Sequence, residues 1–270
     1  MKKSKIFLTF LGSLLGMLWL VPFYLMISNS FKTKREIFES PINLPKGIHI
    51  DNYIKAAENL SFVKTFFNSI LITVVSISII VIFSSMAAYA LSRVKGKVSN
   101  IIFFVFVAAM LIPFQAVMIP LISLFGKAHM LNRAGLMFMY LGFGSSLSIF
   151  LYHGSINALP RSLDEAAIID GCNRFQVFWY VIFPVLKPIT VTVMILNTIW
   201  IWNDYLLPSL VINKTGLETI PLKMFFFFGE YTKQWHLALA GLTLAIIPVI
   251  IFYFIAQKHI IKGVTSGSVK

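Results

Sequence analysis

Long apolar stretches without a charged side chain dominate this sequence. They cover residues 6–31, 65–92, 98–126, 134–160 and 234–257, and a further stretch, 188–213, is interrupted only by Asp204. Each is longer than the roughly 20 residues that an α-helix needs to cross the hydrocarbon of a bilayer. The pattern predicts an all-α membrane protein with six transmembrane helices, at approximately 7–30, 66–91, 101–125, 134–157, 184–207 and 237–257.

The composition supports a membrane protein. Hydrophobic residues make up 58% of the chain, charged residues only 12%, and the mean hydropathy is +0.83. Soluble domains carry about 25% charged residues. The basic start and apolar run of the N-terminus also resemble a secretory signal peptide, but the run is too long and no A-x-A-like cleavage site follows. We therefore expect a retained first helix.

The net charge of +13 is explained by membrane topology rather than by nucleic acid. Basic residues are dense in the short segments 1–5, 92–100 and 258–270, which the positive-inside rule assigns to the cytoplasm. We expect both termini to be cytoplasmic and no nucleic acid to be bound. A basic cluster just outside the first helix, Lys32, Lys34 and Arg35, conflicts with this orientation.

The sequence lacks the residues that a disulfide, a thiolate or zinc site, or a P-loop would need. The single cysteine, Cys172, excludes an internal disulfide and any site with several thiolates. The five histidines form no H-E-x-x-H motif, and the G-K-V-S at 96–99 lacks the upstream glycine of a P-loop. We expect the chain to bind neither a metal ion nor ATP.

Between the predicted fourth and fifth helices, residues 160–183 carry an unusual polar pattern. Ser162 and Glu165 match a capping box that predicts a helix start, and Asp170-Gly171 predicts its end, because glycine accepts the left-handed conformation. The acids can pair with basic groups and the small residues allow another backbone to approach closely. A helix with such residues could dock into a cleft on another subunit. The alternative is a capped loop that is only solvated. The docking candidates are Glu165, Ala166, Ala167, Asp170 and Gly171.

A second short helix is predicted directly after the glycine. Asn173 can cap it, with Gln176 at the third position. Its apolar side chains recur at helical spacing, so we expect this face along the inner membrane surface. The residues of that face are Phe175, Phe178, Trp179 and Ile182. Pro184 and Pro188 then mark the start of the fifth membrane helix.

The sequence EAAIIDG, followed by VIFP, resembles the cytoplasmic EAA loop of permease subunits of ATP-binding-cassette importers. The resemblance extends along most of the chain. Taken together, these segments resemble the smaller permease subunit of maltose and multiple-sugar importers. The other segments that carry it are SFKTKREIF, NYIKAAENLSFVKTFFNSI, AAYALSR, IWNDYLLP and KGVTSGSVK.

The resemblance implies one permease domain over residues 1–270 in a bacterial plasma membrane, with a coupling helix in the loop 160–183. The five docking candidates would enter a cleft of a separate ATPase subunit. The implied partners are a second permease subunit in a heterodimer, two ATPase subunits, an extracellular or periplasmic substrate-binding protein, and membrane lipid. ATP and magnesium would be bound by the ATPase subunits and not by this chain.

Polar and aromatic residues near the end of the fifth predicted helix are candidates for a substrate pathway. Asp204 is the only acid inside a predicted span, where ionisable residues are usually functional. Tryptophans at this level equally fit an aromatic belt at the membrane interface. The pathway candidates are Asn197, Trp200, Asn203 and Asp204. The outer loop 216–235 is the candidate contact for a substrate-binding protein, or an aromatic segment in the interface.

Other functions remain open from the residues alone. A permease of an importer for another solute class would share the same pattern. A self-sufficient secondary transporter should carry several buried ionisable groups and an inverted repeat, and an intramembrane enzyme should carry a cluster of acids, bases or metal ligands. Within the predicted spans only Asp204 qualifies.

Overall fold

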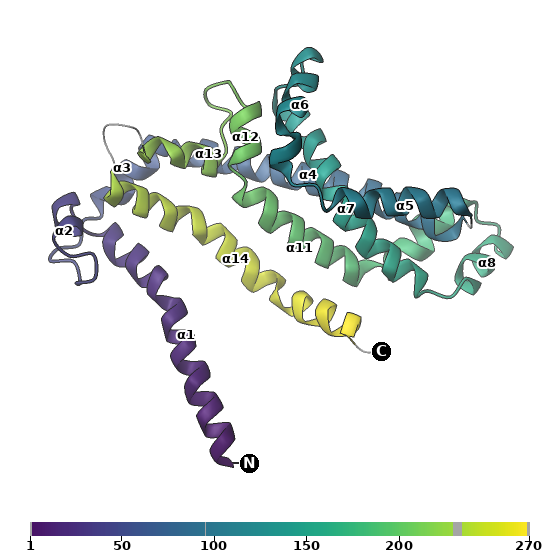
Figure 1. Cartoon of the computed structure of the whole chain (residues 1–270), viewed down its shortest axis with the longest axis horizontal. Coiled ribbons are helices and arrows are strands. Elements are labelled where there is room, and N and C mark those ends of the chain that lie inside the picture. The colour runs from purple at the N-terminus through teal and green to yellow at the C-terminus, as the bar shows by residue number, and fades with distance from the viewer. Residues whose placement is uncertain (1, 95, 229–233, 269–270) are drawn as a thin grey trace. The chain divides into compact units, whose positions relative to one another are not determined.

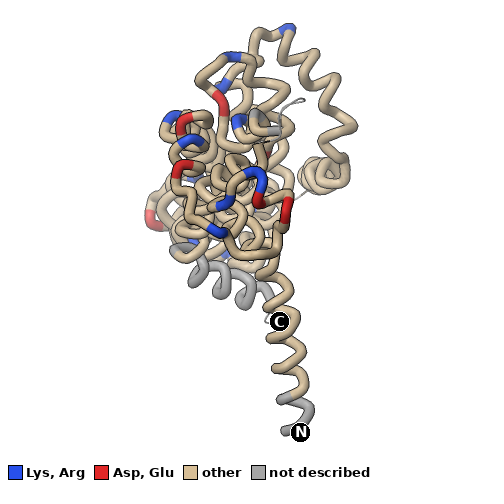
Figure 2. Tube along the Cα trace, turned by 90° about the vertical axis from the view of Figure 1, so that its left-hand side faces the viewer, with Lys and Arg blue, Asp and Glu red and all other residues tan. Residues whose placement is uncertain are grey.

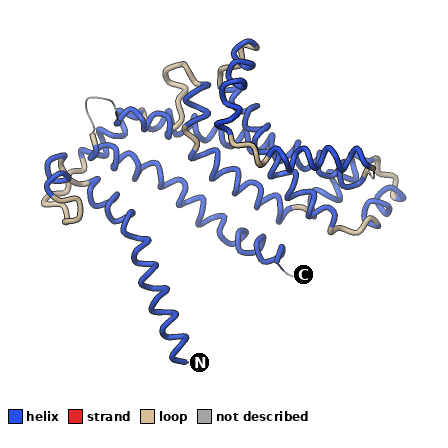
Figure 3. Tube along the Cα trace, in the orientation of Figure 1, coloured by secondary structure: helices blue, strands red, loops and turns tan. Residues whose placement is uncertain are grey.

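The computed structural model describes residues 2–94, 96–228 and 234–268, and these are almost entirely helical, with no strand among them (Figure 1, Figure 3). The helices before the predicted coupling loop are α1 (Lys2–Ser30), α2 (Lys34–Glu39), α3 (Asp51–Leu60), α4 (Phe62–Arg93), α5 (Lys97–Ala109), α6 (Phe114–Lys127) and α7 (Arg133–Asn157). The later elements are α8 (Ser162–Ile169), α9 (Arg174–Gln176), the π-helix η1 (Val177–Ile182), α10 (Phe183–Val185), α11 (Lys187–Asn203), α12 (Leu206–Val211), α13 (Ile220–Met224), the 3₁₀-helix η2 (Phe225–Phe228) and α14 (Trp235–Ser268).

Four helices of the described chain are long and apolar enough to cross a membrane by themselves: Phe7–Ser30, Phe62–Arg93, Arg133–Asn157 and Trp235–Phe254. In Figure 2, the tan part of α1 that follows the N-terminus shows no Lys, Arg, Asp or Glu. Two bent pairs of helices raise the number to six if each pair is one span. This agrees with the prediction of an all-α membrane protein with six spans.

The predicted third span, 101–125, is not one continuous helix. It is divided between α5 and α6, which meet at an angle of 104°. Pro113 lies at the break, in an extended conformation (φ −68°, ψ 142°) directly before α6. Because proline has no N–H and disfavours helix at the preceding residue, α5 cannot continue through it.

The fifth predicted span, 184–207, is also shorter as a continuous helix. Its straight part is α11, which ends at Asn203, because Asp204 adopts an extended conformation (φ −73°, ψ 125°). The segment before it, Arg174–Val185, is bent by 77° relative to α11. Prolines stand in the first turns of both α10 and α11, as predicted.

Contacts divide the chain into two compact units, Met1–Phe66 with Leu222–Ile251, and Phe67–Pro221 with Phe252–Lys270. The single permease domain over 1–270 stays a prediction. In the first unit, a Cβ atom placed on Gly241 of α14 would lie 2.9 Å from Met224 Sδ and 3.1 Å from Leu60 Cδ1. Only glycine lets α14 approach α3 and α13 this closely.

The core of the second unit forms around α7, which packs against α5, α11 and α12. At Gly144 a Cβ atom would meet Ile80 Cδ1 at 2.6 Å and Asn197 Oδ1 at 2.7 Å, so α4 and α11 both press on α7 at this level. Tyr140 and Tyr152 of α7 are fully buried. Membrane helices that pack closely use such small residues at their interfaces.

Candidate coupling site and translocation residues

Helix α8 does not start with the predicted capping box. The residue before the helix is Arg161, in a helical conformation (φ −66°, ψ −22°), and no side chain caps the helix. Ser162 is therefore already the first helical residue, one position too late to act as the cap. The prediction of a Ser162–Glu165 box is wrong because helical hydrogen bonding starts earlier, with the N–H groups of Asp164 and Glu165 bonding to Arg161 O.

The end of α8 is as predicted. Asp170 is the C-cap residue of α8, and Gly171, directly after it, has φ +89°. The N–H of Gly171 donates to Ile168 O and that of Cys172 donates to Ala167 O, both at 3.0 Å. These are the two bonds of a Schellman motif, which needs a left-handed residue at Gly171. The elbow between the two short helices is thus fixed by backbone geometry.

Most of the docking candidates lie on the exposed side of α8. Glu165, Ala166, Asp170 and Gly171 are exposed, whereas Ala167 is buried, at 6% exposure. Ile169 adds an apolar contact that the sequence analysis did not include, since it is 85% exposed. Its neighbour Ile168 is 54% exposed, so α8 presents two adjacent apolar side chains together with the acids.

The base of α8 is joined to α4 through Asp164. Tyr89 Oη donates to Asp164 Oδ1 at 2.6 Å, and the Arg93 guanidinium lies 2.8 Å from Asp164 Oδ2. The Arg93 and Asp164 side chains are only 14% and 12% exposed. Tyr89 and Arg93 are one turn apart on α4, so both reach the same carboxylate. We call this group the Asp164 latch.

An open cavity of about 550 Å³ lies beside the latch. It is formed by the last turns of α4, by α8 and by the start of the following helix. Its lining is mainly apolar, with Arg161 and Arg174 among the basic groups. Among the residues that the structure describes, no group of three or more His, Cys, Asp or Glu side chains is placed to hold a metal ion.

The second short helix has the predicted cap, but only part of the predicted face is accessible, since Phe175 is exposed and Trp179 is half-buried. Asn173 Oδ1 accepts from the Gln176 N–H at 2.9 Å, and Gln176 Oε1 accepts from the Asn173 N–H at 2.8 Å. Phe178 and Ile182, however, are buried inside the protein rather than exposed to a membrane surface. The ring of Phe178 lies 5.4 Å from that of Tyr89. The helix continues as the π-helix η1, so the α-helical spacing used for that prediction does not apply there.

The four pathway candidates in and directly after α11 lie in three different surroundings. Asn197 is buried and donates to Ser148 Oγ at 3.1 Å, which ties α11 to α7. Tyr140 of α7 brings two others together, since it donates to Asp204 Oδ2 at 2.9 Å and meets the Trp200 ring edge-on at 5.4 Å. The fourth candidate, Asn203, is exposed. Their role in a pathway stays a prediction.

Residues 80–266 match the family of binding-protein-dependent transport system inner membrane components. The chain belongs to this family. The matched region contains α8, the Asp164 latch and the residues around Asp204.

Full-length relatives of this permease chain agree with the family. It is 59% identical to the probable starch degradation products transport system permease protein AmyC of Thermoanaerobacterium thermosulfurigenes, over 99% of this chain and 97% of the relative. It is 36% identical to the multiple sugar-binding transport system permease protein MsmG of Streptococcus mutans, over 94% and 93%. Both cover almost the whole permease.

A solved structure has the same fold. The permease superposes with a TM-score of 0.79 and 26% identity on a chain of a bacterial ABC transporter involved in the import of the acidic polysaccharide alginate, covering 96% of this chain and 98% of that one. The predicted resemblance of the chain to permease subunits of ATP-binding-cassette sugar importers is thereby confirmed.

Proposed function

We propose that this chain is the permease subunit of a bacterial ATP-driven oligosaccharide importer, forms half of its translocation path, and is coupled to an ATPase subunit through α8. The oligosaccharide class rests on the relatives, whose names refer to starch degradation products and multiple sugars. The observation that carries the coupling role is the exposed α8, whose base is held to α4 by a buried ion pair.

The contacts supply a mechanism for transmitting motion. The exposed acids Glu165 and Asp170 and the apolar Ile169 would contact the ATPase subunit. A displacement of α8 would be passed to α4 because Asp164 joins the two helices by charge-assisted hydrogen bonds, which are shorter and stronger than neutral ones. Closure of two ATPase subunits would then reorient the spans.

The remaining components follow from this role. The importer would contain a second permease subunit, two ATPase subunits that bind ATP and magnesium, and an extracellular binding protein that delivers the sugar. Both termini and α8 would lie in the cytoplasm. Asn197, Trp200, Asn203 and Asp204 would contribute to the sugar path from this subunit, beside residues of the second permease.

The test is reconstitution of the chain in proteoliposomes with its second permease, ATPase and binding protein. We expect maltodextrin uptake and substrate-stimulated ATP hydrolysis only from the complete assembly. Glu165→Lys should abolish both, because it reverses the charge of an exposed acid on α8. Glu58→Lys makes the same change on α3 and should leave both unchanged.

Two results would contradict the proposal. Uptake driven by an ion gradient with this chain alone would indicate a secondary transporter. Full activity of the Glu165→Lys assembly, with normal recovery of all subunits, would remove α8 from the coupling surface.

A further inference from the structure

The segment that follows α1 turns back along the helix it has just left. Tyr24 Oη donates to Ile42 O at 2.6 Å, although the two residues are 18 positions apart. Tyr24 lies six residues before the end of α1, which is about 9 Å along the helix axis at 1.5 Å per residue. The first residues of the segment 40–48, which we call the return segment, therefore lie beside the last turns of a membrane span.

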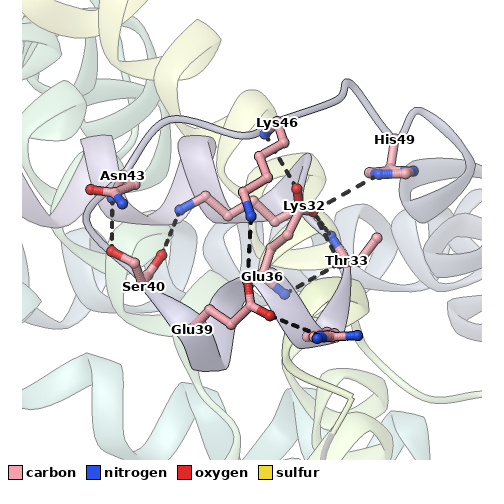
Figure 4. Close-up of polar contacts among 9 residues, drawn as sticks. Lys32, Thr33, Glu36, Glu39, Ser40, Asn43, Lys46 and His49 are labelled. Carbon is pink, nitrogen blue, oxygen red and sulfur yellow. Dashed lines mark hydrogen bonds and ion pairs between the residues drawn. The ribbon is translucent and has the colours of Figure 1, made fainter.

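Side chains of α1 and the residues just after it satisfy the carbonyl groups of the return segment. Asn29 Nδ2 donates to Pro41 O at 2.9 Å. Lys32 Nζ donates to Ser40 O at 3.1 Å (Figure 4). It also donates to Pro41 O at 3.3 Å. Together with Tyr24, these donors cover three consecutive carbonyl groups, Ser40 to Ile42. Such internal pairing is required of irregular backbone that leaves water.

Three backbone N–H groups of the return segment also bond within the protein, beginning with that of Ser40, which donates to Glu36 O at 3.0 Å. Pro41 and Pro45 have no N–H. The N–H of Asn43 donates to Ser40 Oγ at 3.4 Å and that of Lys46 donates to Glu36 Oε1 at 3.3 Å (Figure 4). The segment thus satisfies much of its own polar backbone without water.

Apolar side chains project outward from this internally bonded backbone. Ile42, Leu44 and Ile48 are between 69% and 73% exposed. The basic groups Arg35 and Lys46 stand beside them, and both pair with Glu39, at 2.8 Å and 3.5 Å. Apolar side chains next to basic groups are the composition of segments that lie in the membrane interface.

We propose that the return segment lies in the membrane interface beside α1, with Ile42, Leu44 and Ile48 in contact with lipid. The segment bonds to the last turns of α1, which is long and apolar enough to span a membrane, and it does so through Tyr24, a residue type that membrane proteins concentrate at the boundary between hydrocarbon and water. The segment precedes the residues matched by the family model, 80–266. The proposal goes beyond the transport function and holds for either orientation of α1.

The return segment also encloses one member of the basic cluster that conflicted with the predicted topology. Lys32 is 1% exposed, and its ammonium group is enclosed by Asn29 Oδ1 at 2.9 Å and the carbonyls of the return segment. Arg35 is paired with Glu39. Lys32 is thus enclosed by neutral oxygen atoms, whereas Arg35 is 89% exposed and forms a surface ion pair.

The experiment measures the depth of single fluorescent probes in the full-length chain. In a Cys172→Ser background, one cysteine is introduced at Ile42, Leu44, Ile48 or, as an exposed control on α2, Lys34, and each is labelled with an environment-sensitive dye. The labelled chain is placed alone in nanodiscs of phosphatidylglycerol and phosphatidylcholine. Quenching is recorded with aqueous iodide and with lipids that carry a nitroxide near the headgroup.

We expect the probes at the three apolar positions to be quenched by the lipid nitroxide and to show an iodide quenching constant several-fold lower than the probe at Lys34. Iodide quenching equal to that at Lys34 would overturn the proposal. So would protection that arises only after the second permease or the binding protein is added, since that would identify the surface as a protein contact.

A second variant tests the role of the internal hydrogen bonds. Tyr24→Phe removes the donor to Ile42 O and should raise the iodide quenching of the probe at Ile42 several-fold. A probe at Phe10, exposed on α1, serves as the folding control and should not change. An unchanged Ile42 probe would refute the argument that paired carbonyls keep the segment at this depth.

Discussion

Replacing Asp164 by asparagine should detach α8 from α4 while leaving the side-chain shape almost unchanged. The carboxylate receives the Tyr89 hydroxyl at 2.6 Å and the Arg93 guanidinium at 2.8 Å. Asparagine removes the negative charge but not the positive one, so Arg93 would remain mostly buried without a counter-charge.

The expected magnitude follows from these contacts. Breaking a buried pair by removing one partner costs about 3–5 kcal/mol of the free energy of unfolding. Tyr89→Phe removes one hydrogen bond to a charged group and should cost less, about 1.5–3 kcal/mol. Replacing both charges by apolar residues, as in Arg93→Met with Asp164→Leu, should recover most of the loss, because no unpaired charge remains.

The assay is unfolding of the purified chain in detergent by denaturant, followed by tryptophan fluorescence. In the assembled importer, the asparagine variant should also lose substrate-stimulated ATP hydrolysis more strongly than Tyr89→Phe does. A change below about 0.5 kcal/mol for Asp164→Asn, typical of surface substitutions, would refute the reasoning. A double variant less stable than the single one would refute it equally.

Three further predictions concern Gly171 and Cys172 after α8, and Glu36 in α2. Gly171→Val should reduce transport without preventing insertion, because a β-branched residue at φ +89° is strained by about 1–3 kcal/mol, and wild-type transport rates would contradict the elbow. A membrane-impermeant maleimide should label Cys172 in inside-out vesicles and not in intact cells, and more slowly once ATPase subunits are added; labelling of intact cells would invert the topology. The N–H of Thr33 holds the pKa of Glu36 below its ordinary value of 4.5, so the fold of residues 33–46 is fully supported above that value and weakens as the pH falls through the lowered pKa. The protection of residues 33–46 against hydrogen exchange, relative to the intrinsic exchange rate at each pH, should fall only there, and constant protection would contradict this.

Features set by local signals were predictable from the sequence. The membrane helices follow from uncharged stretches, the elbow from Gly171, and the second cap from the Asn173–Gln176 pair. The elbow and the cap depend on residues within one or two turns of one another, and each membrane helix on the composition of one continuous segment. The family resemblance of EAAIIDG was readable for the same reason.

Features that depend on distant contacts were not predictable. Asp164 carries no local sign that its partners are Tyr89 and Arg93, which lie 75 and 71 residues earlier in the chain. Ser162 satisfied the pattern of a cap, but the start of α8 is decided by the backbone around Arg161. The buried state of Lys32 depends on a fold-back that no periodicity reveals.

The π-helix η1 sets how the chain between α8 and α11 tolerates changes of length. Val177 and Ile182, five residues apart, are both buried, at 1% and 0% exposure. On an α-helix two such positions point about 140° apart, and the wider turn of η1 brings both to one side. Deleting Tyr180, which is 74% exposed, would allow an ordinary α-helix to form with the two buried ends four residues apart. Evolution can therefore shorten this connection by one residue at this place while keeping the same residues inside, whereas an equal deletion in α11 would rotate its buried face away from α7.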